Sequence, residues 1–452
     1  MTALRLASPG PLMRRLARWL GVTEGHAYTL TIGLVVALAT ATIGIPPTLR
    51  HRRVVSAASG PLLPTTRSNR SLTVAGAPVT SPDAAAPLAA PFGPLAPTGT
   101  SQSDDVAVAP STVATPSTPG PPPVPSFADG GALGEVHPLA TVGQPGAPEG
   151  IAVDPTTGAF YVGTDNGSAR GTPGASKVLA YSSAGTLARQ YTVTGQRPGQ
   201  ADGVTGLALD GIGGLYALDA STSRVIRIDL ATGDQANVAR IPDVPACSPA
   251  DQAGMCELSP RDSAPVPKAA AFDGAGNLFV ADTAQGIVWK VTPAGAVSLW
   301  DKSVDFVGPT GAGPAGLAFD GKGQLVLVVS ASLVGLTGAV YVIPVDKAGA
   351  PGNHTRLWQS SPDDAPTGLA LGSSGKIYVT TTGSDALIVL NPEGSVLRTV
   401  TAAAFDTPTG IAFRGQSVLI TNPSATNNDP SHWTVVRAPV QEAGVPLHGE
   451  AG

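Results

Sequence analysis

Six residues at matching positions of a repeated phrase are the strongest candidates for chemistry in this chain. The phrase reads Pro-x-Gly-apolar-Ala-apolar, usually followed by Asp, and it occurs six times with small departures. Its second position holds, copy by copy, Glu149, Thr205, Lys268, Ala315, Thr367 and Thr409. If the fold brings these positions together, one carboxylate, one ammonium and three hydroxyls would form a site for a polar ligand or a cation. The plainer alternative is that all six are turn residues.

The spacing of the phrase predicts the elements that must position these six residues. It returns roughly every 40–60 residues, which is typical of a repeat architecture. Short β-type runs flanked by Gly-containing turns follow the copies, for example Phe160-Tyr161-Val162 and Lys376-Ile377-Tyr378-Val379. Six repeats of about four short strands indicate an all-β, six-bladed β-propeller over residues 134–452. An open solenoid is the structural alternative.

A propeller would place the six residues around one mouth of its central channel. The innermost strand of each blade lines the channel, and the second position of the phrase begins that strand. We expect a strand around residues 136–142 to pair with the last strand, around residues 433–440, and so to close the ring. Closure removes the exposed strand edges at which sheets aggregate.

The repeated strings resemble those of a known superfamily of propellers. Residues 148–154 (PEGIAVD) and 271–282 (AFDGAGNLFVAD) look like gluconolactonase/senescence-marker-protein (SGL) propellers, and they are also similar to NHL-repeat and strictosidine-synthase-like propellers. The resemblance covers about residues 134–452 and implies a six-bladed fold. It also implies a site in which a Glu of the first blade and Asn or Asp of later blades hold Ca²⁺ or another divalent ion. That ion would polarise a lactone carbonyl.

Glu149 alone matches this implied metal site. The family would show Asn-Asp, Asn-Gly and Asp-Gly where this chain has Lys268-Ala269, Ala315-Gly316 and Thr367-Gly368. A hard dication needs about six oxygen ligands, and one carboxylate with three hydroxyls is a poor cage. We therefore expect no cofactor, with Ca²⁺ or another divalent metal at Glu149 as the alternative. Our hypothesis is that Lys268 pairs with Glu149 across the channel in place of the metal, with the three threonines as hydroxyl partners.

Other notable residues of the repeat domain are expected to have structural roles. Cys247 and Cys256 could form a disulfide in an oxidising compartment, bind a metal, or remain unpaired thiols. His432 is expected in a solvated loop, although it could reach the channel mouth. Asp282 is expected to bond to a turn, with a supporting role at the family's metal site as the alternative. The aspartates at strand ends should cap turns, namely Asp154, Asp210, Asp273 and Asp320. The tryptophans of the outer strands should pack between blades, namely Trp289, Trp300 and Trp358.

The first third of the chain predicts export. Residues 1–26 are a basic N-terminal segment, and residues 27–49 carry no charge and are long enough to cross a bilayer once. We expect a single transmembrane anchor, and a signal sequence cleaved near residues 37–41 is the alternative. Residues 50–133 are rich in Pro, Ala, Ser and Thr and predict a disordered linker. Either reading places the propeller outside the cytoplasm, tethered to the cell membrane or secreted.

Composition and charge argue against nucleic-acid binding and leave two classes of function. The net charge is −5 with 13% charged residues, and the repeat domain has no long basic run, so nucleic-acid binding is not expected. The first remaining function is a membrane-tethered, extracytoplasmic module that binds a small molecule or a protein at the channel mouth without catalysis. The second is a divalent-metal-dependent lactonase or related hydrolase. Fold alone does not separate the two.

Overall fold

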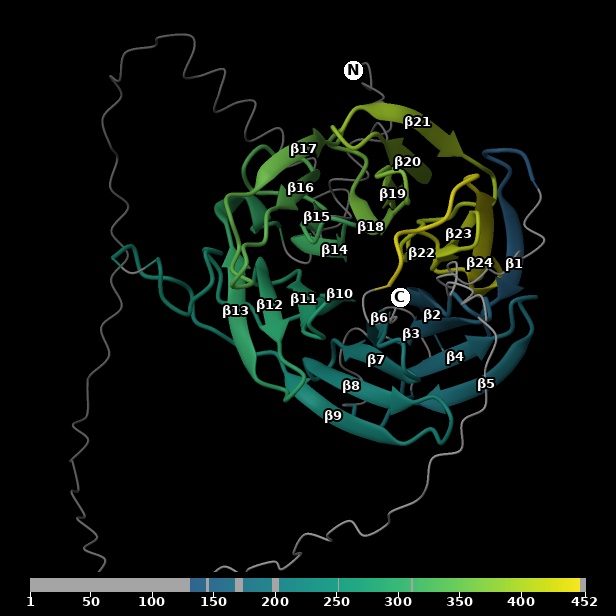
Figure 1. Ribbon diagram of the computed structural model, residues 1–452, viewed down its shortest axis with the longest axis horizontal. Helices are drawn as coiled ribbons and strands as arrows, with labels where there is room; N and C mark the ends of the chain where they lie inside the picture. The colour runs from purple at the N-terminus through teal and green to yellow at the C-terminus, as the bar shows by residue number, and fades with distance from the viewer. Residues whose placement is uncertain are drawn as a thin grey trace, which may run out of the picture. The chain divides into compact units, whose positions relative to one another are not determined.

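The described part of the chain is a ring of six blades. The computed structural model describes residues 131–143, 146–166, 174–196, 203–250, 252–309 and 312–447. These residues form six antiparallel four-stranded sheets arranged around a common centre (Figure 1). The prediction of an all-β, six-bladed propeller is confirmed, and the open solenoid is excluded.

Each of the first five blades consists of four strands that are consecutive in sequence, the first lying innermost. The first two blades are β2 (Ala147–Val153), β3 (Phe160–Asp165), β4 (Lys177–Tyr181) and β5 (Leu187–Thr192), then β6 (Val204–Leu209), β7 (Gly214–Asp219), β8 (Arg224–Asp229) and β9 (Gln235–Arg240). The third and fourth are β10 (Pro267–Phe272), β11 (Leu278–Asp282), β12 (Ile287–Val291) and β13 (Val297–Lys302), then β14 (Pro314–Phe319), β15 (Leu325–Val329), β16 (Ala339–Ile343) and β17 (Thr355–Gln359). The fifth is β18 (Pro366–Leu371), β19 (Ile377–Thr381), β20 (Ala386–Leu390) and β21 (Val396–Thr401).

The sixth blade joins the two ends of the propeller. It contains β22 (Ile411–Arg414), β23 (Ser417–Asn422) and β24 (Thr434–Pro439), and its outermost strand is β1 (His137–Thr141). β1 runs antiparallel to β24, with His137 opposite Arg437 and Thr141 opposite Thr434. The predicted closure of the ring is therefore confirmed.

The hydrophobic core is divided among the blade interfaces. The described residues form six buried apolar clusters, and each cluster draws its members from two neighbouring blades. Trp289 lies between the second and third blades, Trp300 between the third and fourth, and Trp358 packs between the fourth and fifth. The predicted role of these tryptophans in packing between blades is confirmed.

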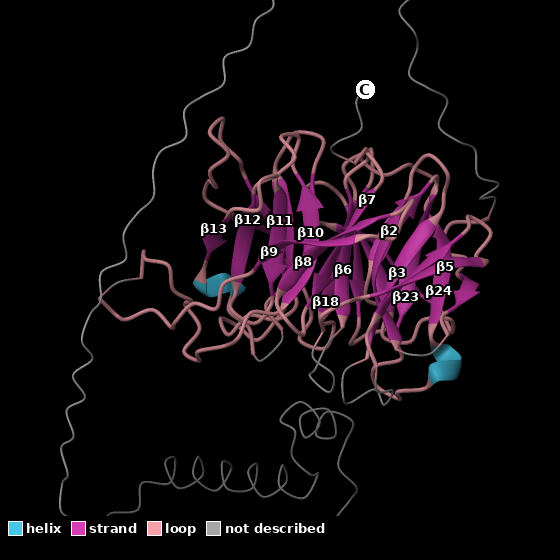
Figure 2. Ribbon diagram, turned by 90° about the horizontal axis from the view of Figure 1, so that it is seen from below, coloured by secondary structure: helices cyan, strands magenta, loops and turns pink. Residues whose placement is uncertain are grey.

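Two short 3₁₀ turns mark one face of the propeller. They are η2 (Val304–Phe306) and η3 (Pro430–His432), and both project from the same side of the sheets in Figure 2. Within the described residues, no helix is both long enough and apolar enough to cross a membrane. The basic segment, the candidate span and nearly all of the linker lie outside those residues.

A bulge near the start of the inner strands sets the direction of the candidate side chains. The register of the pair formed by the first two strands shifts between Pro148 and Ile151 in β2, and between Pro267 and Ala269 in β10. Similar shifts occur in β6, β14 and β18. A bulge adds an unpaired residue and redirects its side chain. In these five blades the bulge includes the second position of the repeated phrase.

Candidate functional site at the channel mouth

The six predicted residues surround a single cavity. A pocket of about 90 Å³ is lined by all six, namely Glu149, Thr205, Lys268, Ala315, Thr367 and Thr409, together with the two residues that follow each of them. We call these six residues the channel ring. The pocket has room for several water-sized groups. The structure thus brings the six copies of the phrase together, and the channel ring lies at the start of the inner strands.

The principal charged contact of the channel ring joins its first and third blades. Lys268 Nζ donates to Glu149 Oε2 at 2.8 Å. The Glu149 side chain is 5% exposed, whereas that of Lys268 is 21% exposed. The ammonium group is thus positioned to meet both the buried carboxylate and a ligand in the channel. This is the contact that the sequence hypothesis proposed in place of a metal.

The hydroxyl groups of the channel ring are held by backbone carbonyls and by a threonine of a second strand. Thr205 Oγ1 donates to Pro267 O at 2.6 Å, which links the second blade to the third. Thr409 Oγ1 lies 3.0 Å from Thr421 Oγ1, and Thr367 Oγ1 donates to Ala365 O at 3.2 Å. A hydroxyl group can also accept hydrogen bonds, so each retains an acceptor function toward a ligand.

Two threonines of second strands support the channel ring, and sequence reasoning missed them. Thr421 Oγ1 donates to Glu149 O at 2.6 Å, and Thr380 Oγ1 donates to Thr409 O at 2.5 Å. Each also accepts from a glycine N–H of its own blade, Gly410 and Gly368 respectively, at 2.9 Å. Each hydroxyl therefore fixes one inner strand to the next. The sequence signal that could have identified them is a threonine at the same place, near the end of the second strand, in two adjacent blades.

The glycine of the phrase allows the inner strands to meet. A Cβ atom at Gly206 would lie 2.6 Å from Lys268 O, and one at Gly316 would lie 2.7 Å from Thr367 O. Real Cβ atoms do not approach backbone oxygen so closely, so a side chain at either position would push neighbouring blades apart. The sequence therefore needs glycine here for close packing around the channel.

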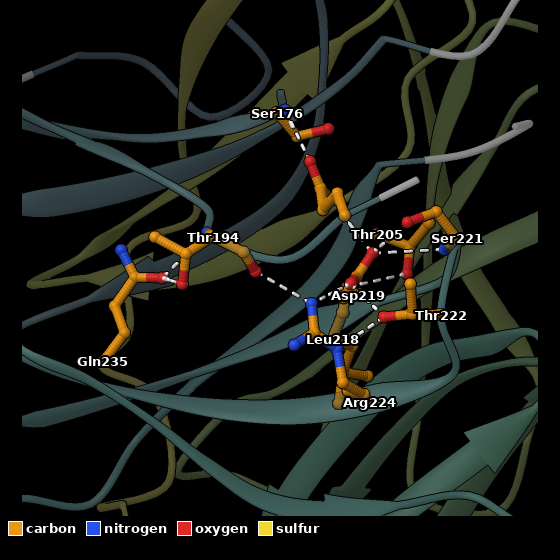
Figure 3. Close-up of polar contacts among 10 residues, drawn as sticks. Ser176, Thr194, Thr205, Leu218, Asp219, Ser221, Thr222, Arg224 and Gln235 are labelled. Atoms are coloured by element: carbon orange, nitrogen blue, oxygen red, sulfur yellow. Dashed lines mark hydrogen bonds and ion pairs between the residues drawn. The ribbon is translucent and has the colours of Figure 1, made fainter. Parts of the chain in front are cut away.

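An aspartate network anchors the second blade beside Thr205. Asp219 is fully buried and accepts from Gln196 Nε2 at 3.0 Å and Arg224 Nη2 at 2.9 Å, and also from Ser221 and Thr222 (Figure 3). Burial acts to raise the pKa of Asp219, but these hydrogen bonds outweigh burial and the pKa is lowered. Asp219 is thus a buried, fully bonded carboxylate that holds the loop 220–223 in place. Sequence reasoning did not identify it.

The donors of the channel ring fit a dication poorly. The only described carboxylate among the ring positions is that of Glu149, and an ammonium nitrogen already lies 2.8 Å from it. Elsewhere in the described residues no group of three or more His, Cys, Asp or Glu side chains is arranged to hold a metal ion. A cation beside the carboxylate repels a metal, and one carboxylate with three hydroxyls falls short of the oxygen ligands that Ca²⁺ takes.

The other predicted residues lie away from the channel. Cys247 and Cys256 form a disulfide in the loop between β9 and β10. His432 lies in η3 with its side chain 57% exposed, and its Nδ1 is 2.8 Å from Asp406 Oδ2. It does not line the cavity. The hydrogen bond to Asp406 raises the pKa of His432.

The predicted turn-capping aspartates are confirmed. Asp154, Asp210, Asp273 and Asp320 each accept hydrogen bonds from backbone N–H groups two to four residues ahead. Asp282 is fully buried and accepts from Val266 N, Gln285 and Trp289 Nε1. Burial raises the pKa of Asp282. These contacts give Asp282 the structural role that the sequence favoured.

Comparisons with known proteins relate this geometry to a family. The sequence profile of the family described as SMP-30/Gluconolactonase/LRE-like region matches residues 269–421. A search of curated protein sequences finds no match. A solved structure described as a proposed gluconolactonase has 18% identity and a TM-score of 0.50, and the match covers 72% of this chain and 98% of that one.

Two further solved structures are similar at lower scores. Regucalcin from Agrobacterium tumefaciens, described as a calcium-binding protein, has 17% identity and a TM-score of 0.48 over 68% of this chain and 97% of that one. A gluconolactonase from Xanthomonas campestris has 16% identity and a TM-score of 0.47 over 67% and 89%. At such identities structural likeness bears on the fold alone. The family profile matches about a third of this chain, residues 269–421, and the six-bladed fold agrees with that match.

Proposed function

We propose that this protein is a binding module whose channel ring holds a small polar ligand without a metal. The observation that carries the proposal is the 2.8 Å contact between Lys268 Nζ and the buried carboxylate of Glu149. An ammonium group has three donors, so Lys268 can satisfy Glu149 and still donate to a ligand. Glu149 and the ring threonines supply acceptors. The ion pair carries no net charge, which favours a neutral ligand.

Binding is favoured over lactone hydrolysis by the chemistry of the same contact. Hydrolysis of the family's kind depends on a divalent ion that polarises the substrate carbonyl. Here Lys268 takes the position beside Glu149 that such an ion would need. The alternative remains a metal-dependent lactonase, and the observation that favours it is Glu149 at the position where the family carries its first metal ligand.

A gain-of-metal experiment distinguishes the two functions. Wild-type protein, Lys268→Asn and the matched exposed variant Lys322→Asn are titrated with Ca²⁺ and Mn²⁺ in thermal-unfolding and calorimetric assays. We expect no metal-dependent shift in wild type or Lys322→Asn. We expect stabilisation of Lys268→Asn, because the ammonium group beside the Glu149 carboxylate is removed and an amide oxygen takes its place. Metal binding to wild type through Glu149, accompanied by lactone turnover that Glu149→Gln abolishes, would reject the proposal.

We also propose that the propeller works outside the cytoplasm on a membrane tether. The uncharged stretch 27–49 and the Pro-rich residues 50–133 support this. The disulfide Cys247–Cys256 supports an oxidising compartment. In intact cells, added protease should degrade the propeller, and the full-length chain should fractionate with membranes. Recovery of a soluble chain that begins near residue 40 would instead favour cleavage and secretion.

A further inference from the structure

A group of exposed apolar side chains lies on the channel-ring face, above the third and fourth blades. Met255, Val304, Leu333, Val334 and Leu336 are 59%, 55%, 44%, 57% and 61% exposed. We call these five residues the apolar rim. Their loops follow the second or fourth strand of a blade. Those strands end where the inner strands begin, as the pairing of Pro267 with Asp282 and of Ile287 with Lys302 shows.

The three loops that carry the apolar rim are fixed to one another. Lys302 Nζ donates to Gly254 O at 2.8 Å and to Cys256 O at 3.0 Å, which joins the end of β13 to the disulfide loop. Leu333 N donates to Val307 O at 2.7 Å and joins the loop after β15 to the loop after β13. The apolar side chains are therefore presented on an ordered backbone.

One residue of the apolar rim sits in an unfavourable backbone conformation. Leu336 has a φ of +56°, in the left-handed region that a branched side chain rarely adopts. The turn is closed by a hydrogen bond from Leu336 N to Ser332 O at 3.0 Å. This turn holds the Leu336 side chain 61% exposed on the channel-ring face.

The apolar rim and the apolar position of the channel ring lie on the same face of the propeller, where the inner strands begin. Ala315, on β14, belongs to the fourth blade, and the described residues 312–313 lie directly before β14. Ala331 N donates to Ala312 O at 2.7 Å, and Ser330 N donates to Gly313 O at 3.0 Å, so residues 330–331 are joined to the residues that precede β14. The other five ring positions are polar. The mouth is therefore polar on five blades and apolar toward the fourth.

We propose that the ligand is an amphiphile. Its small, uncharged, hydrogen-bonding head lies in the channel ring, and its aliphatic chain extends outward over the fourth blade onto the apolar rim. This inference rests on the proposed function and adds the ligand class. A charged head would compete with Glu149 or Lys268 for the partner that each already has. Exposed charges of both signs lie on the same face, Asp243, Asp262 and Asp363 together with Arg240 and Arg261, so this face has no excess of positive charge to attract an anionic lipid surface.

Diols of increasing chain length test this arrangement. 1,2-Propanediol, 1,2-hexanediol and 1,2-octanediol share one head and differ only in the aliphatic chain. Binding to the full chain is followed by methyl NMR, with the ring threonines reporting the head and Val304, Leu333 and Val334 reporting the chain. Each buried methylene should raise affinity about two- to fourfold, so the octanediol should bind at least about 30-fold more tightly than the propanediol.

Matched variants separate the head site from the apolar rim. Val334→Asp/Leu336→Asp should abolish the dependence on chain length and leave propanediol binding unchanged. Val396→Asp/Leu397→Asp, on the exposed strand β21, is the control and should change neither. Equal affinity for all three diols at the threonines would overturn this inference and leave the proposed function intact. The proposed function would be rejected instead if affinity rises with the length of the diol, the ring threonines show no signal change, and binding persists in Lys268→Met.

Two outcomes overturn the inference outright. The first is the absence of binding by all three diols. The second is binding of the full chain to vesicles of phosphatidylcholine and phosphatidylglycerol that is lost in Val334→Asp/Leu336→Asp, because it would assign the apolar rim to a membrane surface.

Discussion

Burial makes Glu149 dependent on Lys268. A carboxylate that is 5% exposed has lost most of its hydration, and Lys268 Nζ at 2.8 Å replaces part of it. Removing one partner of a buried pair leaves an uncompensated charge, whereas replacing both partners with neutral groups is often tolerated. The pair therefore contributes to a defined site geometry more than to net stability.

Lys268→Met should destabilise the fold by roughly 3 kcal/mol, because it leaves the Glu149 carboxylate buried without its cation. Glu149→Gln/Lys268→Met should recover most of that loss, since neither charge remains. Urea denaturation of wild type, both single variants and the double variant completes the cycle. Additive losses in the double variant would show that the two side chains do not interact.

Glu257 is a second residue whose charge state affects the stability of the fold. It is fully buried in the long loop before β10. Its Oε1 accepts from Ser263 N at 2.7 Å, and its Oε2 has no hydrogen-bond partner among the described residues. Burial, assisted by the charges of Asp262, Asp282 and Asp243, raises the pKa of Glu257 from 4.5 to about 7. The folded protein therefore holds a proton there that the unfolded chain releases above about pH 4.5.

Wild-type stability should consequently fall as the pH rises from about 4.5 to 7, and the fall due to this group should end above pH 7. Glu257→Gln keeps the shape and removes the titration, so it should be more stable than wild type at pH 8 by roughly 2 kcal/mol and nearly equal at pH 4.5. Denaturation curves at both pH values test this, with exposed Glu393→Gln as the control. A pH-independent difference would reject the role of ionisation.

The channel ring could be predicted from the sequence because the phrase that positions its residues repeats once in each blade. Each copy of the phrase marks the same place in a blade, so aligning copies identified Glu149 and Lys268 as neighbours of one channel. Thr380, Thr421 and Asp219 were missed for the opposite reason. The partners of the two threonines lie on other strands or in the next blade, as the bond from Thr421 Oγ1 to Glu149 O shows, and Asp219 is joined to the preceding blade by Gln196. Such contacts depend on the angle between blades, which periodicity does not specify.

At the scale of elements, neighbouring inner strands approach so closely that a Cβ atom at the glycine positions would clash. Five of the six copies of the phrase carry glycine after the ring residue, and the third carries Ala269. The strands themselves were predictable from short apolar runs between turns. The bulges at their starts were not, because a register shift is set by the partner strand. The bulges nevertheless direct Glu149 and Lys268 into the channel.

Gly316→Ala tests the tight packing of these strands. The added Cβ would lie 2.7 Å from Thr367 O, so the fourth and fifth blades must separate, at a cost of about 1–3 kcal/mol. Gly321→Ala is the matched control, since nothing lies within 4 Å of a Cβ there. Chemical denaturation compares the two. Equal free energies of unfolding for the two variants would show that the blades can accommodate the added methyl group at this contact.

At the scale of the whole molecule, stability depends on closing the ring. Each of the six apolar clusters lies between two blades, so within the described residues each blade shares its core with its neighbours. The cluster between the sixth and first blades contains Ala140 of β1 together with Leu419, Trp433 and Val435. β1 comes from the other end of the described chain, and Val142 N donates to Trp433 O at 2.8 Å beside it. Loss of β1 would open this interface and expose the edge of β24.

Ala140→Asp should open the ring, whereas the matched Thr141→Asp should not. Ala140 is 7% exposed within the closing cluster, so a carboxylate there would be buried without a partner, at a cost of roughly 3 kcal/mol or more. Thr141 is the next residue on β1 and its side chain is exposed. Ala140→Asp should therefore melt several degrees below Thr141→Asp, and light scattering after size exclusion should detect association through β24, because an unpaired strand edge recruits other chains. If both variants melt together and remain monomeric, β1 does not hold the ring closed and the inter-blade clusters suffice without it.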